Sequence, residues 1–190
     1  VRETAFDNWP DGREVHWSSG YLWYLRGLGE LRRAVGADDE PLRNALTRAA
    51  VWANPLLLAL GLPLAAGLAA RRVHWLAGCA LPLAALGVPA FYEVFLPAYP
   101  DHHGPLALAI LGGLLGLLLA GAGWVHPGAR GVGWPPPPGE ADALRGARLS
   151  AASFAVGVWL SAISTALVLF AVGVGALLVA LGFRRAAAQQ

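Results

Sequence analysis

One short stretch of this sequence has side chains that could bind a metal ion. Asp101, His102 and His103 are consecutive, between Pro97-Ala98-Tyr99-Pro100 and Gly104-Pro105. The prolines restrict the backbone on both sides, which suits a site whose ligands must be held still. In an extended backbone Asp101 and His103 reach the same ion, and a carboxylate with an imidazole suits Mn²⁺ or a similar cation. Two protein ligands leave such a site incomplete, so others must come from elsewhere in the fold.

The same residues have a plainer interpretation. A loop that meets water at the end of an apolar segment is polar whatever its function, and three residues make a short motif. Asp-His-His also occurs in a family of soluble phosphoesterases, but those are α/β proteins that need further Asp motifs, which this sequence lacks. A metal site and a merely polar loop therefore both remain open for 101–103.

The composition indicates which elements must position this loop. Hydrophobic residues make up 56% of the chain and charged residues 14%, where about 25% charged is usual for a globular domain. A helix of about 20 apolar residues spans a bilayer core about 30 Å thick. Four stretches lack any charged residue over such lengths: 49–70, 73–92, 102–129 and 149–183. We therefore expect an all-α, polytopic integral membrane protein.

We expect about five transmembrane helices within a membrane domain of residues 49–185. Pro55 and Pro63 should kink the first, with neighbouring helices satisfying the freed carbonyls. The stretch 149–183 would be about 50 Å long as one helix, so two passes with a turn near 161–165 fit better, and one tilted helix is the alternative. The expected spans are about 49–70, 73–92, 104–125, 149–164 and 166–183, with a tail at 186–190.

Residues 1–48 are expected to form an external loop with an amphipathic helix of about four turns lying in the membrane plane. The alternative is a solvated helix packed on a domain outside this sequence. Arg26 and Glu30 are four residues apart on the polar face. The apolar face recurs at helical spacing: Tyr21, Tyr24, Leu25, Leu28, Leu31 and Val35.

The arginines predict an orientation, because cytoplasmic loops are enriched in basic residues. If Arg71 and Arg72 are cytoplasmic, the loop 93–103, which has no basic residue other than histidine, is external. Loop 126–148 and the arginines at 184–185 are then cytoplasmic. We expect a multi-pass protein of the cell (inner or plasma) membrane with Asp101–His103 outside. Arginines that flank membrane segments also explain the net charge of +2 without nucleic acid.

Several motifs together resemble the STT3-type oligosaccharyltransferases, within the wider class of polytopic glycosyltransferases that use lipid-linked sugars. A polar external segment with Trp9-Pro10-Asp11-Gly12 and His16-Trp17 precedes two spans, and a short external loop then ends in Asp101-His102-His103. The stretch Gly157–Ser161 is similar to the short-helix turn after the cytoplasmic loop of bacterial relatives. The resemblance covers nearly the whole chain, and the Asp-His-His loop is its most specific element.

The resemblance implies a metal-dependent transferase of protein glycosylation. It would move a glycan from a polyprenyl phosphate or pyrophosphate donor in the bilayer to an acceptor, expected to be a protein, on the external face. Asp101 and His103 would hold the catalytic divalent metal, Mn²⁺ or Mg²⁺, and His102 would support them. His16 is a possible neighbour on the same face, whereas His126 is predicted on the opposite one.

The sequence also departs from the family pattern. The family's first metal-binding Asp follows the first span, and Asp7 and Asp11 do not occupy an equivalent place. Ser18–Trp23 stands where relatives often have Pro-Pro-Leu-Phe-Asp, and the family's external Glu loop and Trp-Trp-Asp domain are missing. The sequence contains no Met. We therefore expect a fragment whose full catalytic centre needs the remainder of the same polypeptide.

Two other functions remain open. One is a related glycosyltransferase that acts on lipid or polymer. The other is a non-catalytic polytopic protein, either an assembly subunit or a portion of a transporter. No Asp, Glu, Lys or Arg lies inside the expected spans, which argues against an ion-coupled carrier.

Overall fold

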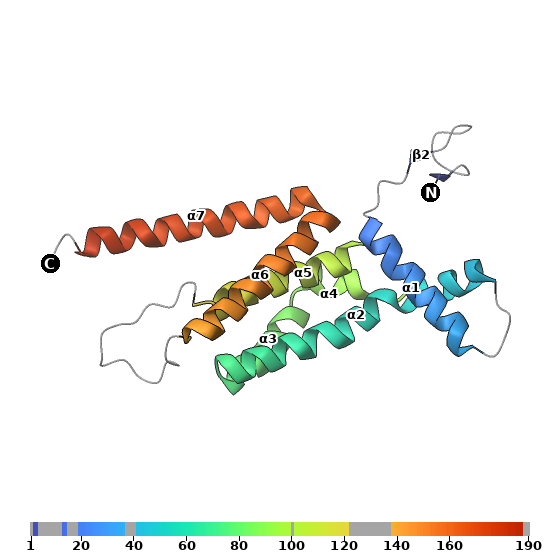
Figure 1. The fold of residues 1–190 in the computed structure, drawn as a ribbon, viewed down its shortest axis with the longest axis horizontal. Helices are drawn as coiled ribbons and strands as arrows, with labels where there is room; N and C mark the ends of the chain where they lie inside the picture. Colours follow the sequence, from blue (N-terminus) through green and yellow to red (C-terminus); the bar gives the residue numbers. More distant parts are fainter. Residues whose placement is uncertain are drawn as a thin grey trace.

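In the computed structural model, the described part of the chain is almost wholly helical, which confirms the all-α class (Figure 1). Two short antiparallel strands, β1 (Arg2–Glu3) and β2 (Arg13–Glu14), precede the helices. The structure describes residues 2–3, 13–14, 19–36, 41–99, 101–121 and 138–187. Its helices are α1 (Ser19–Val35), α2 (Leu42–Arg72), α3 (Trp75–Leu86), α4 (Pro89–Tyr92), the 3-10 helix η1 (Glu93–Phe95), α5 (His103–Leu119), α6 (Glu140–Leu160) and α7 (Ala162–Ala187).

Two of these helices are long and apolar enough to cross a membrane: α2, and residues 162–181 of α7. The helices of 75–86 and 89–95 pass the same test together, but they are bent by 83°. Helix α5 is apolar but has only 17 residues. The structure thus has two or three candidate spans by length and composition, which is consistent with a membrane protein. Five crossings remain a prediction.

The second expected span, 73–92, is not one straight helix. Helix α3 ends at Leu86, and α4 begins at Pro89. Val88 between them has an extended backbone, with φ −100° and ψ 107°. Proline disfavours the helical conformation in the residue before it, which explains the break at this point. The bend leaves a straight helix of 12 residues.

The third, fourth and fifth expected spans also differ in their bounds. Helix α5 ends at Leu119 rather than near 125, and Gly121 then adopts a φ of +92°, which turns the chain. The stretch 149–183 is divided at Ser161, whose backbone is extended (φ −156°, ψ 98°), so it is two helices and not one. Helix α6 starts at Glu140, and it is not among the candidate spans.

Helix α2 begins at Leu42 and continues through both of its prolines, Pro55 and Pro63. Pro55 has no N–H to offer the carbonyl of Val51, four residues earlier. The backbone N–H of Ala98 donates to that carbonyl at 3.0 Å. Ala98 lies in the loop that leads to α5. The proline therefore opens an anchoring point on α2 for this loop, as expected from a proline inside a membrane helix.

Helix α1 packs along the first half of α2. Tyr21 is 1% exposed, and the hydroxyl of Tyr24 donates to the carbonyl of Ala53 at 2.7 Å. Gly29 lies so close to Leu46 that a Cβ there would be 2.8 Å from its side chain. Part of the apolar face of α1 is thus covered by α2 of the same chain. Its position in a membrane plane remains a prediction.

Helix α5 packs tightly on α6 through small residues. A Cβ at Gly113 would lie 2.6 Å from the ring of Phe154, and one at Gly116 would collide with the backbone of Ser150. Small residues let helix backbones approach closely where no water drives their association. This pair forms the rigid support that carries His103 at the start of α5.

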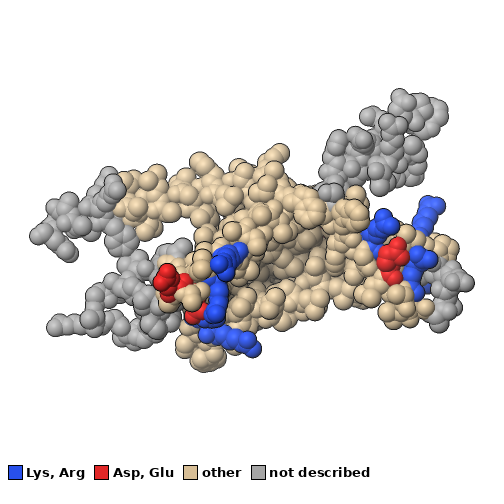
Figure 2. Space-filling view, viewed as in Figure 1, with Lys and Arg blue, Asp and Glu red and all other residues tan. Residues whose placement is uncertain are grey.

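The charged side chains visible in Figure 2 gather at the two ends of the molecule. One group lies over α1 and the first turns of α2, and the other lies where α2 ends and α6 begins. In the second group, Asp142 pairs with Arg72 at 2.5 Å and with Arg145 at 2.9 Å. Two charged ends separated by an apolar middle suit a bundle that crosses a bilayer.

Candidate metal centre

The loop before α5 places Asp101 two residues ahead of the start of that helix. Ala98 has a left-handed backbone (φ 61°), and the N–H of Asp101 donates to the carbonyl of Tyr99 at 2.9 Å. The carbonyl of His102 accepts from Leu106 at 3.1 Å, so the helical hydrogen bonding starts at His102. His102 is in the helical region (φ −67°, ψ −9°), whereas the sequence interpretation assumed an extended backbone.

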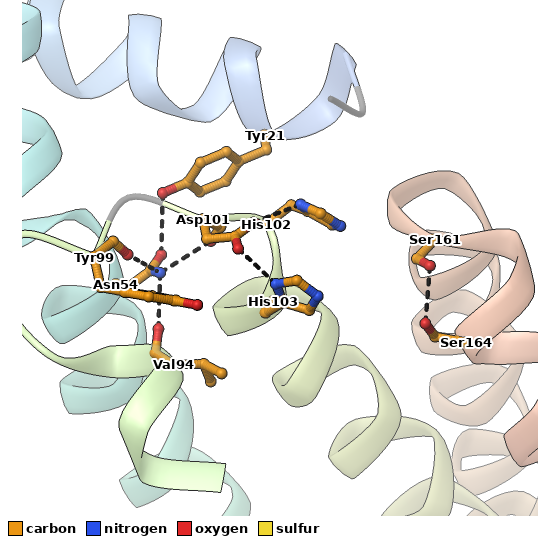
Figure 3. Close-up of polar contacts among 9 residues, drawn as sticks. All are labelled: Tyr21, Asn54, Val94, Tyr99, Asp101, His102, His103, Ser161 and Ser164. Carbon is orange, nitrogen blue, oxygen red and sulfur yellow. Dashed lines mark hydrogen bonds and ion pairs between the residues drawn. The ribbon is translucent and has the colours of Figure 1, made fainter. Parts of the chain in front are cut away.

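The three side chains nonetheless converge. Nδ1 of His102 lies 2.6 Å from Oδ1 of Asp101, and Nδ1 of His103 lies 2.6 Å from Oδ2 (Figure 3). The two imidazole rings stack with their centroids 4.4 Å apart. One potential ligand atom from each of the three residues falls within 4.8 Å of the others. His102 therefore belongs to the cluster as much as the two outer residues do.

Asp101 remains a carboxylate over a wider pH range than an isolated aspartate. Burial opposes its ionisation, but the hydrogen bond from His103 and the charges of the two imidazoles outweigh this cost. The pKa of Asp101 is therefore lowered. The ionised form is the one that binds a cation.

The ring of His102 leaves one hydrogen-bonding atom unused. Its Nδ1 is buried, and the short approach to Asp101 lacks the orientation of a hydrogen bond. Within the described part of the chain this nitrogen has no hydrogen-bond partner. When the imidazole is protonated, this nitrogen forms an ion pair with Asp101, and when Nδ1 carries no proton its lone pair can bind a cation. Two imidazoles and one carboxylate suit Mn²⁺ and other transition metals better than Mg²⁺, which prefers oxygen ligands.

Asn54 of α2 holds the loop in place from below. It is 1% exposed, and its Nδ2 group faces the carbonyls of Val94 at 2.9 Å, Tyr99 at 2.8 Å and Asp101 at 2.9 Å (Figure 3). An amide NH₂ has two protons, so the three acceptors share them. The backbone of the Asp101 loop is thus fixed to the first half of a candidate membrane span.

Gly104 makes this approach possible. It is buried on the first turn of α5, and a Cβ added to it would lie 2.8 Å from Cγ of Asn54. Any larger residue would therefore push α5 away from the amide. The sequence interpretation treated Gly104-Pro105 as a restraint on the backbone. Gly104 is also the place where α5 packs against Asn54.

Helix α1 completes the network from the other side. The hydroxyl of Tyr21 donates to Oδ1 of Asn54 at 3.3 Å. Burial, with smaller contributions from Tyr24 and Asp101, raises the pKa of Tyr21 well above its usual range, and burial raises the pKa of Tyr24 to about 12. Both hydroxyls therefore stay protonated and act as donors. The docking of α1 and the geometry of the Asp101 loop depend on the same amide.

The turn between α6 and α7 faces the histidines across the site. Ser161 donates from Oγ to Oγ of Ser164 at 3.0 Å, and Figure 3 places this pair beyond His103, on the side away from Asn54. Thr165, one residue further, is fully buried, and within the described residues its hydroxyl has no hydrogen-bond partner. The hydroxyl groups of Ser161 and Ser164 thus lie on the side of His103 away from Asn54 in Figure 3.

The structure brings together three of the four residues that the sequence proposed for the site: Asp101, His102 and His103. The fourth, His16, lies outside the described residues, as do His126 and the stretch 9–12. Glu93, in η1, is exposed and is not part of the cluster.

Sequence reasoning missed Asn54 and Tyr21. Asn54 had a visible signal, because it is the one strongly polar side chain in the apolar stretch 49–70, and polar groups inside membrane helices usually have a function or a partner. Tyr21 had none beyond its place on the apolar face of a helix. Their contact joins residues 33 positions apart, which no local pattern reveals.

Comparison with known proteins adds nothing to this geometry. No protein family, curated protein or solved structure matches the chain. The interpretation of the site therefore depends on its own side chains and on the resemblance of the motifs described above.

Proposed function

We propose that this chain is part of a metal-dependent membrane glycosyltransferase of the oligosaccharyltransferase type. It would move a glycan from a polyprenyl phosphate or pyrophosphate donor to an acceptor, with protein as the favoured acceptor class, on the external face of the membrane. The observation that carries this proposal is the convergence of Asp101, His102 and His103 at the start of the apolar helix α5.

In this proposal Asp101 and His103 hold a divalent cation, and His102 contributes through the lone pair of a ring nitrogen. The cation would offset the charge that develops as the phosphate of the donor departs. Asn54 positions Asp101 through the backbone and does not touch the ion. The remaining ligands, and the group that activates the acceptor, would come from the rest of the polypeptide.

The proposed membrane arrangement has five crossings, with the Asp101 loop and α1 on the external side. Figure 2 supports a crossing, since the charged side chains gather at two ends and the arginines at the end of α2 lie at the end of the molecule opposite α1. Donor lipid from the bilayer would then reach the loop from the external leaflet.

The experiment measures glycan transfer by the full-length protein in membranes, with and without Mn²⁺. Asp101→Ala and His103→Ala should each abolish metal-dependent transfer. Glu93→Gln is the matched control, because it removes an exposed carboxylate eight residues away that is outside the cluster. Unchanged transfer in both cluster variants would refute the proposal. Metal binding without any transfer to protein would favour a lipid or polymer acceptor, and no metal binding would favour an assembly subunit or transporter portion.

A further inference from the structure

A groove with a volume of about 740 Å³ runs beside the contact between α1 and the first half of α2. This size is in the range of about 300–1,000 Å³ usual for small-molecule sites. The groove is formed by residues different from those of the Asp101 cluster. Its lining residues are Leu28, Leu31, Arg32, Arg33, Val35, Gly36, Asn44, Arg48, Ala49, Trp52 and Leu56.

The wall from α2 changes from polar to apolar along its length. Asn44, Arg48, Trp52 and Leu56 follow one another at intervals of four residues, so they form a single ridge of the helix. From Arg48 to Leu56 the ridge extends about 12 Å toward the candidate span. Trp52 is 58% exposed and Leu56 is 44% exposed, so both apolar side chains are open to a ligand.

The wall from α1 also changes from polar to apolar toward the same end of the groove. The two helices run in opposite directions, so the early residues of α1 lie beside the later residues of this part of α2. Tyr24 contacts Ala53 near the inner end, and Gly29 contacts Leu46 further out. Leu28 of α1 therefore lies toward the apolar end of the groove. Arg32, Arg33 and Gly36 lie toward its outer, polar end.

We propose that this groove binds one phospholipid with an anionic headgroup of the phosphatidylglycerol type. Three arginines line the groove, and none of its lining residues in the described part of the chain is acidic, so the charge of this lining is complementary to a phosphate. Trp52 and Leu56 then accommodate the first part of an acyl chain. In the proposed membrane arrangement the apolar end of the groove is nearest the bilayer, so the acyl chain would enter the groove from that end.

The existing contacts of the arginines leave room for this ligand. Arg33 pairs with Glu30 at 3.1 Å, but both side chains are nearly half exposed, and such surface pairs are weak. Arg32 and Arg48 have polar interactions of their own. A guanidinium group has five N–H donors, so one partner does not exhaust it.

The test is a lipid titration of the delipidated full-length protein, with bound lipid counted by native mass spectrometry. Phosphatidylglycerol should bind about tenfold or more tightly than phosphatidylcholine with the same acyl chains. The double variant Arg33→Gln/Arg48→Gln should lose this preference. The double variant Arg26→Gln/Arg43→Gln removes two arginines from the same helices but outside the groove, and should keep it.

A second variant tests the groove without changing its charge. Ala49→Trp fills the lining from α2 and should abolish bound phosphatidylglycerol, provided that its thermal unfolding matches the unmodified protein. Equal binding of both lipids, equal loss in the two double variants, or unchanged binding in Ala49→Trp would each overturn the proposal. Displacement of the lipid by millimolar glycerol phosphate would also overturn it, because it would show a site for a free phosphate.

Discussion

Two aspartates at opposite ends of the bundle are each contacted by two basic side chains, but the two sites differ in kind. Asp142 lies between Arg72 and Arg145, and Asp101 lies between two histidines. Guanidinium groups have only donors, so they neutralise Asp142 and cannot join it as ligands. Imidazoles can bind a metal through a lone pair. A carboxylate becomes a candidate metal site through its neighbours rather than through its own charge.

The two aspartates are also held differently. Asp142 is on the first turn of α6, and its partners reach it as partly exposed side chains. The pKa of Asp142 is lowered chiefly by its hydrogen bond from Arg72. Asp101 is on a loop, and its backbone is fixed by a buried amide on another helix. Disruption of that amide should therefore affect one end of the molecule and spare the other.

The largest effect is expected from Asn54→Ala. It leaves three loop carbonyls and the Tyr21 hydroxyl without their buried partner, which should cost about 2–4 kcal/mol of unfolding free energy. Chemical unfolding in detergent measures this cost. Thr47→Ala, on the same helix, removes a hydroxyl that is exposed and bonds only to the carbonyl of Arg43. Equal losses in the two variants would show that Asn54 does not organise the loop.

A smaller loss is expected from Gly104→Ala. The new methyl group would meet Asn54 at 2.8 Å, and such overpacking costs about 1–3 kcal/mol. Gly67→Ala on α2 is the control, because nothing lies within 4 Å of an added Cβ there. That change should be neutral or stabilise α2 by about 0.5–1 kcal/mol, since alanine favours helix. If Gly67→Ala loses as much stability as Gly104→Ala, the loss at Gly104 does not come from its contact with Asn54.

The pH dependence of stability tests the lowered pKa of Asp101. Because the folded pKa lies below the unfolded value of about 3.9, the carboxylate stabilises the fold above that value. This contribution is lost as the pH falls through the folded pKa. The difference in Tm between the unmodified protein and Asp101→Asn should thus be largest near neutral pH and shrink below about pH 4. A difference that grows on acidification would contradict the sign of the shift.

The smallest effect is expected from Asp142→Asn. Its pairs with Arg72 and Arg145 are partly exposed, so water and salt screen them. The Tm should fall only slightly at low ionic strength and not at all at high salt. If the loss of Tm in Asp142→Asn persists in high salt, or is as large as the loss in Asn54→Ala, the Asp142 and Asp101 sites do not differ in the way described.

The sequence predicted the helical class and pointed to the cluster of Asp101, His102 and His103 because both are local properties. Long uncharged stretches indicate helices, and Asp101, His102 and His103 are adjacent in the chain. The break at Val88 could also have been expected from Pro89. The length of the uncharged stretch 73–92 favoured a single span instead. The anchoring of the loop by Asn54 joins residues 40 to 47 positions apart, and such pairings follow only from the packed fold.

The helix bounds were less predictable for a similar reason. Charged residues mark where an apolar stretch ends, but helices continue past them when caps and neighbours allow it. Helix α6 thus starts at Glu140, ahead of the uncharged stretch that begins at 149. Its acidic first turn favours the helix, because negative charge stabilises a helix N-terminus.

The central proposal is that the Asp101 cluster binds a divalent transition metal and that the Asp142 cluster does not. The most direct measurement is electron paramagnetic resonance of Mn²⁺ titrated into the full-length protein, with detection of coupled imidazole nitrogen. We predict nitrogen coupling in the unmodified protein, its weakening in His103→Ala, and at least about tenfold weaker binding in Asp101→Ala, with no change in Asp142→Ala. Mn²⁺ binding that is identical in the Asp101 and Asp142 variants, or that shows no nitrogen coupling, would contradict it.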